Sequence, residues 1–303
     1  GQRGYPVDGR SYHRTCGGRG VAMKSVAEML ELKTVRFLEP DYASLVNNGE
    51  PGVLICEAEP AAGGARMLID DAENPVLLAV FAGDEWVATS WNFRNPTEPE
   101  FELFSAADGD VYQEPRSEIE DALRAHFSGI LQEEIAPARE DLPADRIEKV
   151  RDLLHEVWGT SAPGLCLDAC AGSGIGSMII REMGGRPLAY DNDPALLALG
   201  LETGRLIPEE TLCIDGTVAS AYLPDADRGL GIMFGQMYVY TQDLWRPILE
   251  ELAGITGETL ITVATEEEAR WVREWAAGVD RSMEIWENDR DPIYDRWVCH
   301  SNL

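Results

Sequence analysis

Hydrophobic and polar residues follow two different rhythms along the chain, and the change falls near residue 140. Beyond it, short apolar runs of strand length alternate with stretches in which apolar residues recur every three or four positions. Strands are predicted at 165–169, 188–191, 211–215, 229–234 and 259–264, with two closing strands at 282–286 and 297–301. Because helices separate these strands, the second half predicts a parallel sheet covered on both faces.

The predicted helices of this half have recognisable ends. Asp193 precedes Pro194 and is expected to cap the helix that follows 188–191. Thr265 and Glu268 have the spacing of a capping box in front of another helix. These signals set helix boundaries between the predicted strands and support the alternating pattern.

The first half combines a helical stretch with several short strands. Residues 21–47 have helical spacing, and strands are predicted at 53–57, 67–70, 76–81, 86–91 and 101–104. Ala82-Gly83-Asp84 predicts a hairpin turn, and a helix with one apolar face is expected to open at Ser117. This half therefore predicts an antiparallel meander with helices.

A chain of 303 residues exceeds the usual length of one domain. The change of rhythm, together with a short acidic, proline-bearing stretch at 136–143, predicts a linker. We predict a smaller α+β domain at 1–136 and a Rossmann-like α/β domain at 141–303. The first domain contains no chemical motif, and we expect it to recognise the substrate, since specificity is often supplied by a module added to a generic fold.

The charge balance is strongly acidic, with 54 Asp and Glu residues against 25 Lys and Arg and a formal net charge of −29. Such a field repels polyanions, so nucleic acid is an unlikely partner. The few lysines, which are Lys24, Lys33 and Lys149, are typical of proteins from salt-adapted or related archaea. A solvated surface that keeps the protein soluble explains the acidity equally well.

The cysteines are scattered, and the chain shows neither an apolar leader nor a run of roughly 18 apolar residues that would span a bilayer. We expect reduced thiols, a cytoplasmic location and no membrane partner. Because Gly1 has no methionine before it, we expect the natural chain to begin earlier. Residues 1–20 form a basic island, in which His13 and Cys16 are too few to make a zinc site.

The clearest chemical signal is the stretch 165–176, LCLDACAGSGIG, in which an apolar strand ends in an acid and turns through glycines into a helix. Gly172 and Gly174 allow a tight turn and a close approach to a ligand, and the helix offers free amide donors. A dinucleotide fingerprint requires glycine at the sixth position, where Ser177 stands. The loop is instead predicted to bind a nucleoside, with Asp168 suited to the ammonium group of a methionine moiety, directly or through water.

Two further acids follow the next predicted strands. Asp191 is placed to accept both hydroxyl protons of a ribose, and Asp215 to accept from the exocyclic amine of adenine. Because the carboxyl ends of parallel strands meet at one edge, these acids and Asp168 are expected to face one crevice. The predicted cofactor-binding set is completed by their neighbours Ala169, Gly172, Ser173, Gly174, Asn192 and Gly216.

From about residue 141 to the end, the chain resembles the class I S-adenosylmethionine-dependent methyltransferase family. The stretch 168–174 looks like the first motif of that family, Asp191 like its ribose-binding acid and Asp215 like its adenine-contacting acid. The resemblance implies a seven-stranded sheet whose last strand is antiparallel, S-adenosylmethionine as the cofactor, and methyl transfer as the activity.

One stretch departs from the family. Members that methylate amines of nucleic acid or glutamine carry Asn or Asp, two prolines and an aromatic residue after the fourth strand, whereas residues 234–240 read FGQMYVY. Gln236 and Tyr238 are the candidates for orienting the acceptor, with Asp243 a weaker one. Alternatively the tyrosines only pack, and Cys170 is expected to fill its turn as a small buried thiol.

The acceptor is left open by the sequence, with a protein side chain or a small molecule favoured over nucleic acid. The main alternative is a non-catalytic, regulatory protein that binds S-adenosylmethionine or another nucleoside in a methyltransferase-like fold. Such a protein would be favoured if Met237 or Tyr238 filled the space beyond the methyl group. A transferase with a decarboxylated donor is a weaker alternative, because Asp168 suits an intact methionine end.

Overall fold

The fold is that of a computed structural model, which describes residues 13–14, 23–46, 50–160 and 162–302. Most of the basic island at 1–20, with Cys16, lies outside the described residues. Residue contacts divide the chain into two compact units, 1–126 and 127–303, which are described separately. Among the described helices, none combines the length and the hydropathy needed to cross a bilayer.

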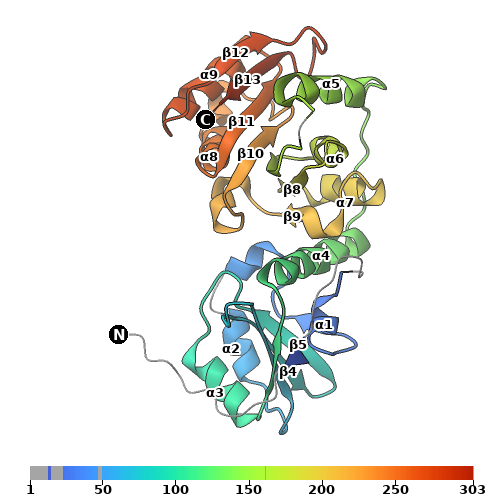
Figure 1. Cartoon of the computed structure of the whole chain (residues 1–303), viewed down its shortest axis with the longest axis vertical. Coiled ribbons are helices and arrows are strands. Elements are labelled where there is room, and N and C mark those ends of the chain that lie inside the picture. The colour runs from blue at the N-terminus through green and yellow to red at the C-terminus, as the bar shows by residue number, and fades with distance from the viewer. Residues whose placement is uncertain (1–12, 15–22, 47–49, 161, 303) are drawn as a thin grey trace. The chain divides into compact units, whose positions relative to one another are not determined.

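The second unit is built on a seven-stranded sheet with the order β12-β13-β11-β10-β7-β8-β9 (Figure 1). Its strands are β7 (Leu165–Ala169), β8 (Arg186–Asp191), β9 (Thr211–Cys213), β10 (Ala226–Gly231), β11 (Thr256–Val263), β12 (Glu284–Glu287) and β13 (Trp297–Ser301). Neighbouring strands from β9 to β11 pair in parallel, while β13 is antiparallel to both β11 and β12. This order, with an antiparallel last strand, confirms the predicted Rossmann-like methyltransferase sheet.

Helices cover both faces of this sheet. They are α5 (Arg146–Trp158), α6 (Ile175–Glu182), α7 (Pro194–Glu202), α8 (Gln242–Gly254) and α9 (Glu266–Ala277), with short 3-10 turns η2 (Pro208–Glu210), η3 (Gly216–Ala221) and η4 (Val239–Thr241). Leu230 packs with α5 and α6, whereas the neighbouring Gly229 leaves space for Leu252 of α8 on the opposite face. Figure 1 shows α5 and α6 on one side of the sheet and α8 and α9 on the other.

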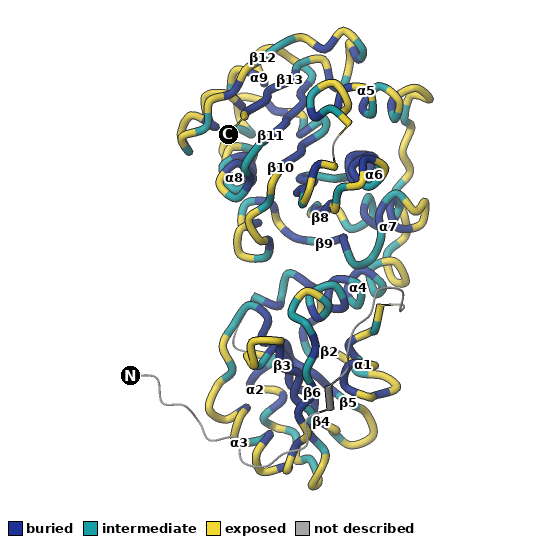
Figure 2. Tube along the Cα trace, in the orientation of Figure 1, coloured by how far each residue is buried: buried dark blue, intermediate teal, exposed yellow. Residues whose placement is uncertain are grey.

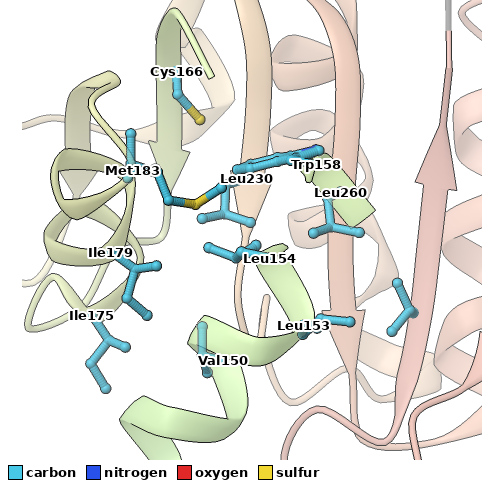
Figure 3. Packing of buried hydrophobic residues seen from close by; sticks show 12 residues of the cluster. Val150, Leu153, Leu154, Trp158, Cys166, Ile175, Ile179, Met183, Leu230 and Leu260 are labelled. Atoms are coloured by element: carbon cyan, nitrogen blue, oxygen red, sulfur yellow. The ribbon is translucent and has the colours of Figure 1, made fainter. Parts of the chain in front are cut away.

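The core on the α5 side is a continuous apolar cluster. Val150 and Leu154 of α5 lie against Ile179 of α6 and against Leu230 and Leu260 of the central strands (Figure 3). All five side chains are at most 1% exposed. Burying such side chains contributes about 1.5–3 kcal/mol each, so this cluster holds the sheet and the two helices in a fixed arrangement.

The first unit contains a six-stranded sheet with the order β1-β6-β3-β4-β5-β2. Its elements are β1 (His13–Arg14), α1 (Val26–Met29), β2 (Arg36–Phe37), η1 (Ala43–Val46), α2 (Glu50–Cys56), β3 (Ala65–Ile69), β4 (Pro75–Ala82), β5 (Glu85–Ser90), α3 (Glu98–Ala106), β6 (Asp110–Gln113) and α4 (Arg116–Glu134), which continues into the second unit. The antiparallel β3-β4-β5 meander and its turn at Gly83 confirm the prediction. Figure 2 shows the strands of both units largely buried.

Three predictions for the first unit were wrong. In place of one helix over 21–47, the described residues 23–46 contain the short helix α1, the strand β2 and the 3-10 turn η1, and Glu31 adopts a left-handed φ of 56° just after α1. All but the last residue of the run 53–57 belong to α2, where Ile55 is buried while Val53 is 62% exposed. The run 101–104 belongs to α3, which begins with a capping box between Thr97 and Glu100.

The second unit required smaller corrections. The strand predicted at 229–234 is β10, which begins and ends three residues earlier. It ends before Met233, whose φ of 48° turns the chain away from the sheet. The stretch 136–143, predicted as a linker, falls within the second unit: Ala138 donates a 2.9 Å backbone hydrogen bond to Ala195, and Glu140 bonds to the glycine loop.

Candidate cofactor-binding site

The candidate site lies where the strand order of the sheet reverses. From β7 the chain proceeds outward through β8 and β9, whereas β10 pairs on the other side of β7 and leads to β11. Asp168 of β7 and Leu230 of β10 are register partners near the carboxyl ends of these central strands. Ligands of open α/β sheets bind in the crevice outside such a reversal.

A glycine loop connects β7 to α6 at this point. Cys170, Gly172 and Gly174 adopt left-handed φ values of 50°, 53° and 83°. Gly174 is the N-cap of α6, and an added Cβ there would lie 2.4 Å from Cδ2 of Leu206. The loop thus needs glycine at 174 for both backbone conformation and space, which confirms the tight turn into a helix N-terminus.

Asp168 lies beneath this loop and is only 1% exposed. Its Oδ2 accepts a 2.7 Å hydrogen bond from Oγ of Ser177 in the first turn of α6. Burial raises the pKa of Asp168 to about 6, against the lowering effect of the hydrogen bonds from Ser177 and with a further increase from the Asp191 carboxylate.

Asp191 stands at the end of β8, next to the glycine loop. Its Oδ2 accepts a 2.9 Å hydrogen bond from the Gly172 amide, and its Oδ1 accepts one of the same length from the Asp193 amide. Burial raises the pKa of this carboxyl, against the lowering effect of these backbone bonds. Asn192 beside it is exposed, and Asp193 caps α7 as predicted.

Asp215 follows β9, the next strand outward. It is exposed, and its Oδ1 accepts a 2.8 Å hydrogen bond from the Thr217 amide as the N-cap of η3. Gly216 is buried, and an added Cβ there would come within 3.5 Å of the Tyr190 ring. The three acids therefore lie at or just beyond the ends of three neighbouring strands, as expected, and the hydrogen bond from the Gly172 amide ties Asp191 to the loop above Asp168.

Sequence reasoning missed the partner of Ser173. The Ser173 hydroxyl donates a 2.5 Å hydrogen bond to Oε2 of Glu140, which also forms an ion pair with Arg205. Glu140 lies 33 residues earlier in the chain, within the acidic stretch interpreted as a linker. No local signal marks this pairing, because it depends on how the chain returns across α7.

The loop after β10 carries the two residues predicted to orient an acceptor. Gln236 and Tyr238 are both exposed, and the Tyr238 hydroxyl donates a 3.3 Å hydrogen bond to Oε1 of Gln236. The Tyr238 ring stacks on that of Tyr240 at 5.3 Å between centroids. Met237 points the other way, since its side chain is buried and its amide donates to Glu268. Asp243 is also exposed, in the first turn of α8.

Two other reactive groups lie near the loop: Tyr190 is buried, whereas Cys170, which was expected to be a buried thiol, is half-buried. Burial raises the pKa of the Cys170 thiol and of the Tyr190 hydroxyl, so neither is ionised near neutral pH. Within the described ranges, no group of three or more His, Cys, Asp and Glu side chains is arranged to hold a metal ion. The chemistry available at this edge is therefore that of carboxylates, backbone amides and the exposed amide and phenol after β10.

No protein-family model matches the chain, and no curated protein matches it either. Solved methyltransferase structures are similar at low identity. The magnesium protoporphyrin IX methyltransferase from Synechocystis with bound S-adenosylmethionine has 10% identity, covers 61% of this chain and 97% of its own, and gives a TM-score of 0.42. The precorrin-6y C5,15-methyltransferase from Geobacter metallireducens has 14% identity, covers 56% of this chain and 94% of its own, and gives a TM-score of 0.39. A TehB-like S-adenosylmethionine-dependent methyltransferase from Corynebacterium glutamicum has 18% identity, covers 50% of this chain and 86% of its own, and gives a TM-score of 0.40.

Proposed function

We propose that the chain binds S-adenosylmethionine at the carboxyl ends of β7, β8 and β9 and transfers its methyl group. The observation that carries this proposal is the position of Asp168, Asp191 and Asp215, which lie at or just beyond the carboxyl ends of three neighbouring parallel strands beside the reversal of strand order. A nucleoside with a cationic end needs such an ordered row of acids, whereas a pyrophosphate would be repelled by it.

The individual contacts follow from the chemistry of each group. A carboxylate offers about four lone-pair sites, and Asp191 uses two of them for backbone amides, which leaves acceptors for both ribose hydroxyls. Asp215 is exposed and accepts from the adenine amine. The glycine loop, with Gly172 and Gly174 and the flanking Ala169, Ser173, Asn192 and Gly216, encloses the nucleoside and the methionine end.

The transfer itself is an in-line displacement. A lone pair of the acceptor forms a bond to the methyl carbon while the bond from carbon to the sulfonium sulfur breaks, which leaves a neutral thioether. The protein's main contribution is alignment of the two partners. Gln236 and Tyr238, on the loop after the strand that pairs with β7, orient the acceptor.

The acceptor is a protein side chain or a small molecule in this proposal, and nucleic acid is disfavoured. The net charge of −29 repels a polyanion at long range, while a neutral or basic acceptor meets no such barrier. The absence of the two prolines after β10 also separates this loop from the amine-methylating pattern that nucleic-acid enzymes of the resembled family carry.

Isothermal titration with S-adenosylmethionine and S-adenosylhomocysteine tests the cofactor. We expect dissociation constants on the order of micromolar and at least about a tenfold weakening in Asp191→Ala, because a hydrogen bond to a charged group is lost. Glu284→Ala, an exposed acid on the edge strand β12, is the matched control and should bind normally. No binding at millimolar ligand would overturn the proposal.

A second measurement separates an enzyme from a binding protein. Gln236→Ala should bind S-adenosylmethionine with unchanged affinity. In a cell extract that supplies acceptors, it should form S-adenosylhomocysteine about tenfold more slowly than the unmodified protein. Val239→Ala, which alters an exposed side chain on the same loop, is the control. Cofactor binding without any turnover in the unmodified protein would favour the regulatory alternative, and unchanged turnover in Gln236→Ala would remove the role of that residue.

A further inference from the structure

The first unit contains a pocket of about 680 Å³ that has no part in the proposed methyl transfer. It is lined by the segment 91–96 after β5, by Asn74 and Pro75 at the start of β4, by Phe101 of α3 and by Arg116 of α4. Its volume lies in the range typical of small-molecule sites. All of these residues belong to one compact unit, so the pocket is intact in that unit alone.

The charges in the pocket wall are already neutralised. Arg94 is 4% exposed and donates to both oxygens of Glu100, over 2.6 and 2.9 Å. Arg116 is paired with Asp70 at 3.5 Å and with Glu120 at 3.0 Å. A ligand therefore meets neither a spare cation nor a spare carboxylate in these pairs, which argues against both anionic and cationic ligands.

One wall residue has unused hydrogen-bonding capacity. Asn92 is 7% exposed, and neither its Oδ1 nor its Nδ2 has a partner among the described residues. Its backbone is held, since its amide donates to Oγ of Ser90 and its carbonyl accepts from Arg116. A buried amide without partners costs about 1–3 kcal/mol, and a rotation of this side chain toward the pocket would let a ligand supply both a donor and an acceptor.

The apolar part of the wall is aromatic. The Trp91 ring is fixed by a 3.0 Å hydrogen bond from its Nε1 to Oε1 of Glu100 and packs against Phe101, with 5.7 Å between ring centroids. Phe101 is 38% exposed, although it is a large apolar side chain. Aromatic walls of this kind favour flat ligands that stack on or against the rings.

We propose that this pocket binds an uncharged, planar group that carries adjacent hydrogen-bond donor and acceptor atoms, such as a carboxamide or a nucleobase-like heterocycle. Oδ1 and Nδ2 of Asn92 are enclosed in this structure, and once the side chain rotates toward the pocket its amide is complementary to such an edge, because it carries one donor group and one acceptor side by side. The exposed ring of Phe101, which packs against the buried Trp91 ring, contacts the flat face. The ion pairs of Arg94 and Arg116 form part of the wall but favour neither an anionic nor a cationic ligand.

Titration of the full chain, followed by ligand-observed NMR, tests this proposal without any cofactor. Benzamide, benzoate and benzamidine have nearly the same shape but are neutral, anionic and cationic, and uracil represents the heterocycle. We expect benzamide or uracil to bind with a dissociation constant on the order of millimolar, and the two charged probes to bind at least about tenfold more weakly. Binding of uracil but not benzamide would identify a heterocycle, and the reverse a carboxamide.

Two variants locate the site. Asn92→Leu should abolish binding while thermal stability stays equal or increases, because an unpaired buried amide is removed. Phe101→Ala should weaken binding, whereas Phe81→Ala, which truncates a 39% exposed phenylalanine on β4 outside the pocket, should not. If Asn92→Leu does not fold, the difference in binding between Phe101→Ala and Phe81→Ala tests the location of the site. Three results would overturn the proposal. All probes could bind equally, no probe could bind at tens of millimolar ligand, or the two phenylalanine variants could have equal effects on binding.

Discussion

The backbone amide of Gly172 donates a 2.9 Å hydrogen bond to Oδ2 of Asp191, so the loop after β7 is anchored to the end of β8. The same carboxylate accepts from the Asp193 amide at the start of the α7 cap. One side chain thus fixes the glycine loop and the following strand end relative to each other. In the function proposed above, ribose recognition and the order of the glycine loop are therefore coupled through Asp191.

Exchange of the Gly172 amide with solvent measures this coupling. Asp191→Ala removes the charged acceptor, and we expect the amide to exchange about ten to a hundred times faster, which corresponds to the usual strength of a hydrogen bond to a charged group. Hydrogen exchange followed by NMR gives the rate for this single amide. Glu284→Ala should leave the rate unchanged, and an equal rate in Asp191→Ala would show that the loop is held by other contacts.

Stability should depend on pH through Asp168. Burial raises the pKa of this carboxyl from 3.8 to about 6, so the folded state binds the proton more tightly than the unfolded state. The contribution of Asp168 therefore disfavours folding above pH 6, and this penalty is relieved as the pH falls toward 4. The difference between the folded and unfolded pKa values corresponds to about 3 kcal/mol of unfolding free energy.

The Asp168→Asn variant isolates this effect, because the amide oxygen still accepts from Ser177 but does not titrate. We expect its free energy of unfolding, relative to the unmodified protein, to increase by about 2.5 kcal/mol between pH 4 and pH 8, because part of the difference is already present at pH 4. Urea unfolding across this range gives the difference at each pH. A difference that is constant with pH would mean that the pKa of Asp168 is not raised.

The sequence predicted best those features that depend on neighbouring residues. The limits of β7, the Asp193 cap and the Thr265 capping box are set by short-range contacts, and all three appear as expected. The runs at 53–57 and 101–104 are short apolar stretches that fit a strand or a buried helix face equally well. In the second of these, the capping box at Thr97 decided for a helix.

The candidate site likewise contains features that the sequence could predict and features that it could not. The glycine loop and the acids at the strand ends could be located because each follows directly from the strand before it. The bond from Ser173 to Glu140 could not, since it joins segments 33 residues apart whose meeting depends on tertiary packing. The burial of Asp168 beneath its own loop also depends on how α6 packs on β7, which periodicity alone does not describe.

The two loop glycines should differ in their tolerance of alanine. At Gly172 an added Cβ would meet nothing within 4 Å, so only the left-handed φ of 53° opposes alanine, at about 1–2 kcal/mol. At Gly174 the Cβ would also lie 2.4 Å from Leu206, which adds about 1–3 kcal/mol of overpacking. Urea unfolding should therefore rank Gly174→Ala below Gly172→Ala in stability, and the reverse order would contradict this account of the loop.

A buried ion-pair network holds the loop between β12 and β13. Nη1 of Arg146 lies 2.7 Å from Oδ2 of Asp295 and 3.4 Å from Oδ2 of Asp291, and all three side chains are at most 4% exposed. Asp295 also accepts a 2.6 Å hydrogen bond from Thr262 of β11. The network joins the start of α5 to the loop at 288–296, on the same edge of the sheet as the candidate site.

Arg146→Met should destabilise the protein strongly, because it leaves two carboxylates buried without a cation, a loss of about 3–5 kcal/mol. Burial already raises the pKa of Asp295, and removal of the guanidinium should raise it further, so the deficit should shrink at acid pH, where the carboxyl is protonated. Lys149→Met on the same helix removes a pair with the exposed Asp145 and an electrostatic attraction to Asp291, and should destabilise the protein far less. Urea unfolding at pH 7.5 and at pH 5 measures the stability of both variants. Equal stability of the two variants would mean that the network does not contribute to folding.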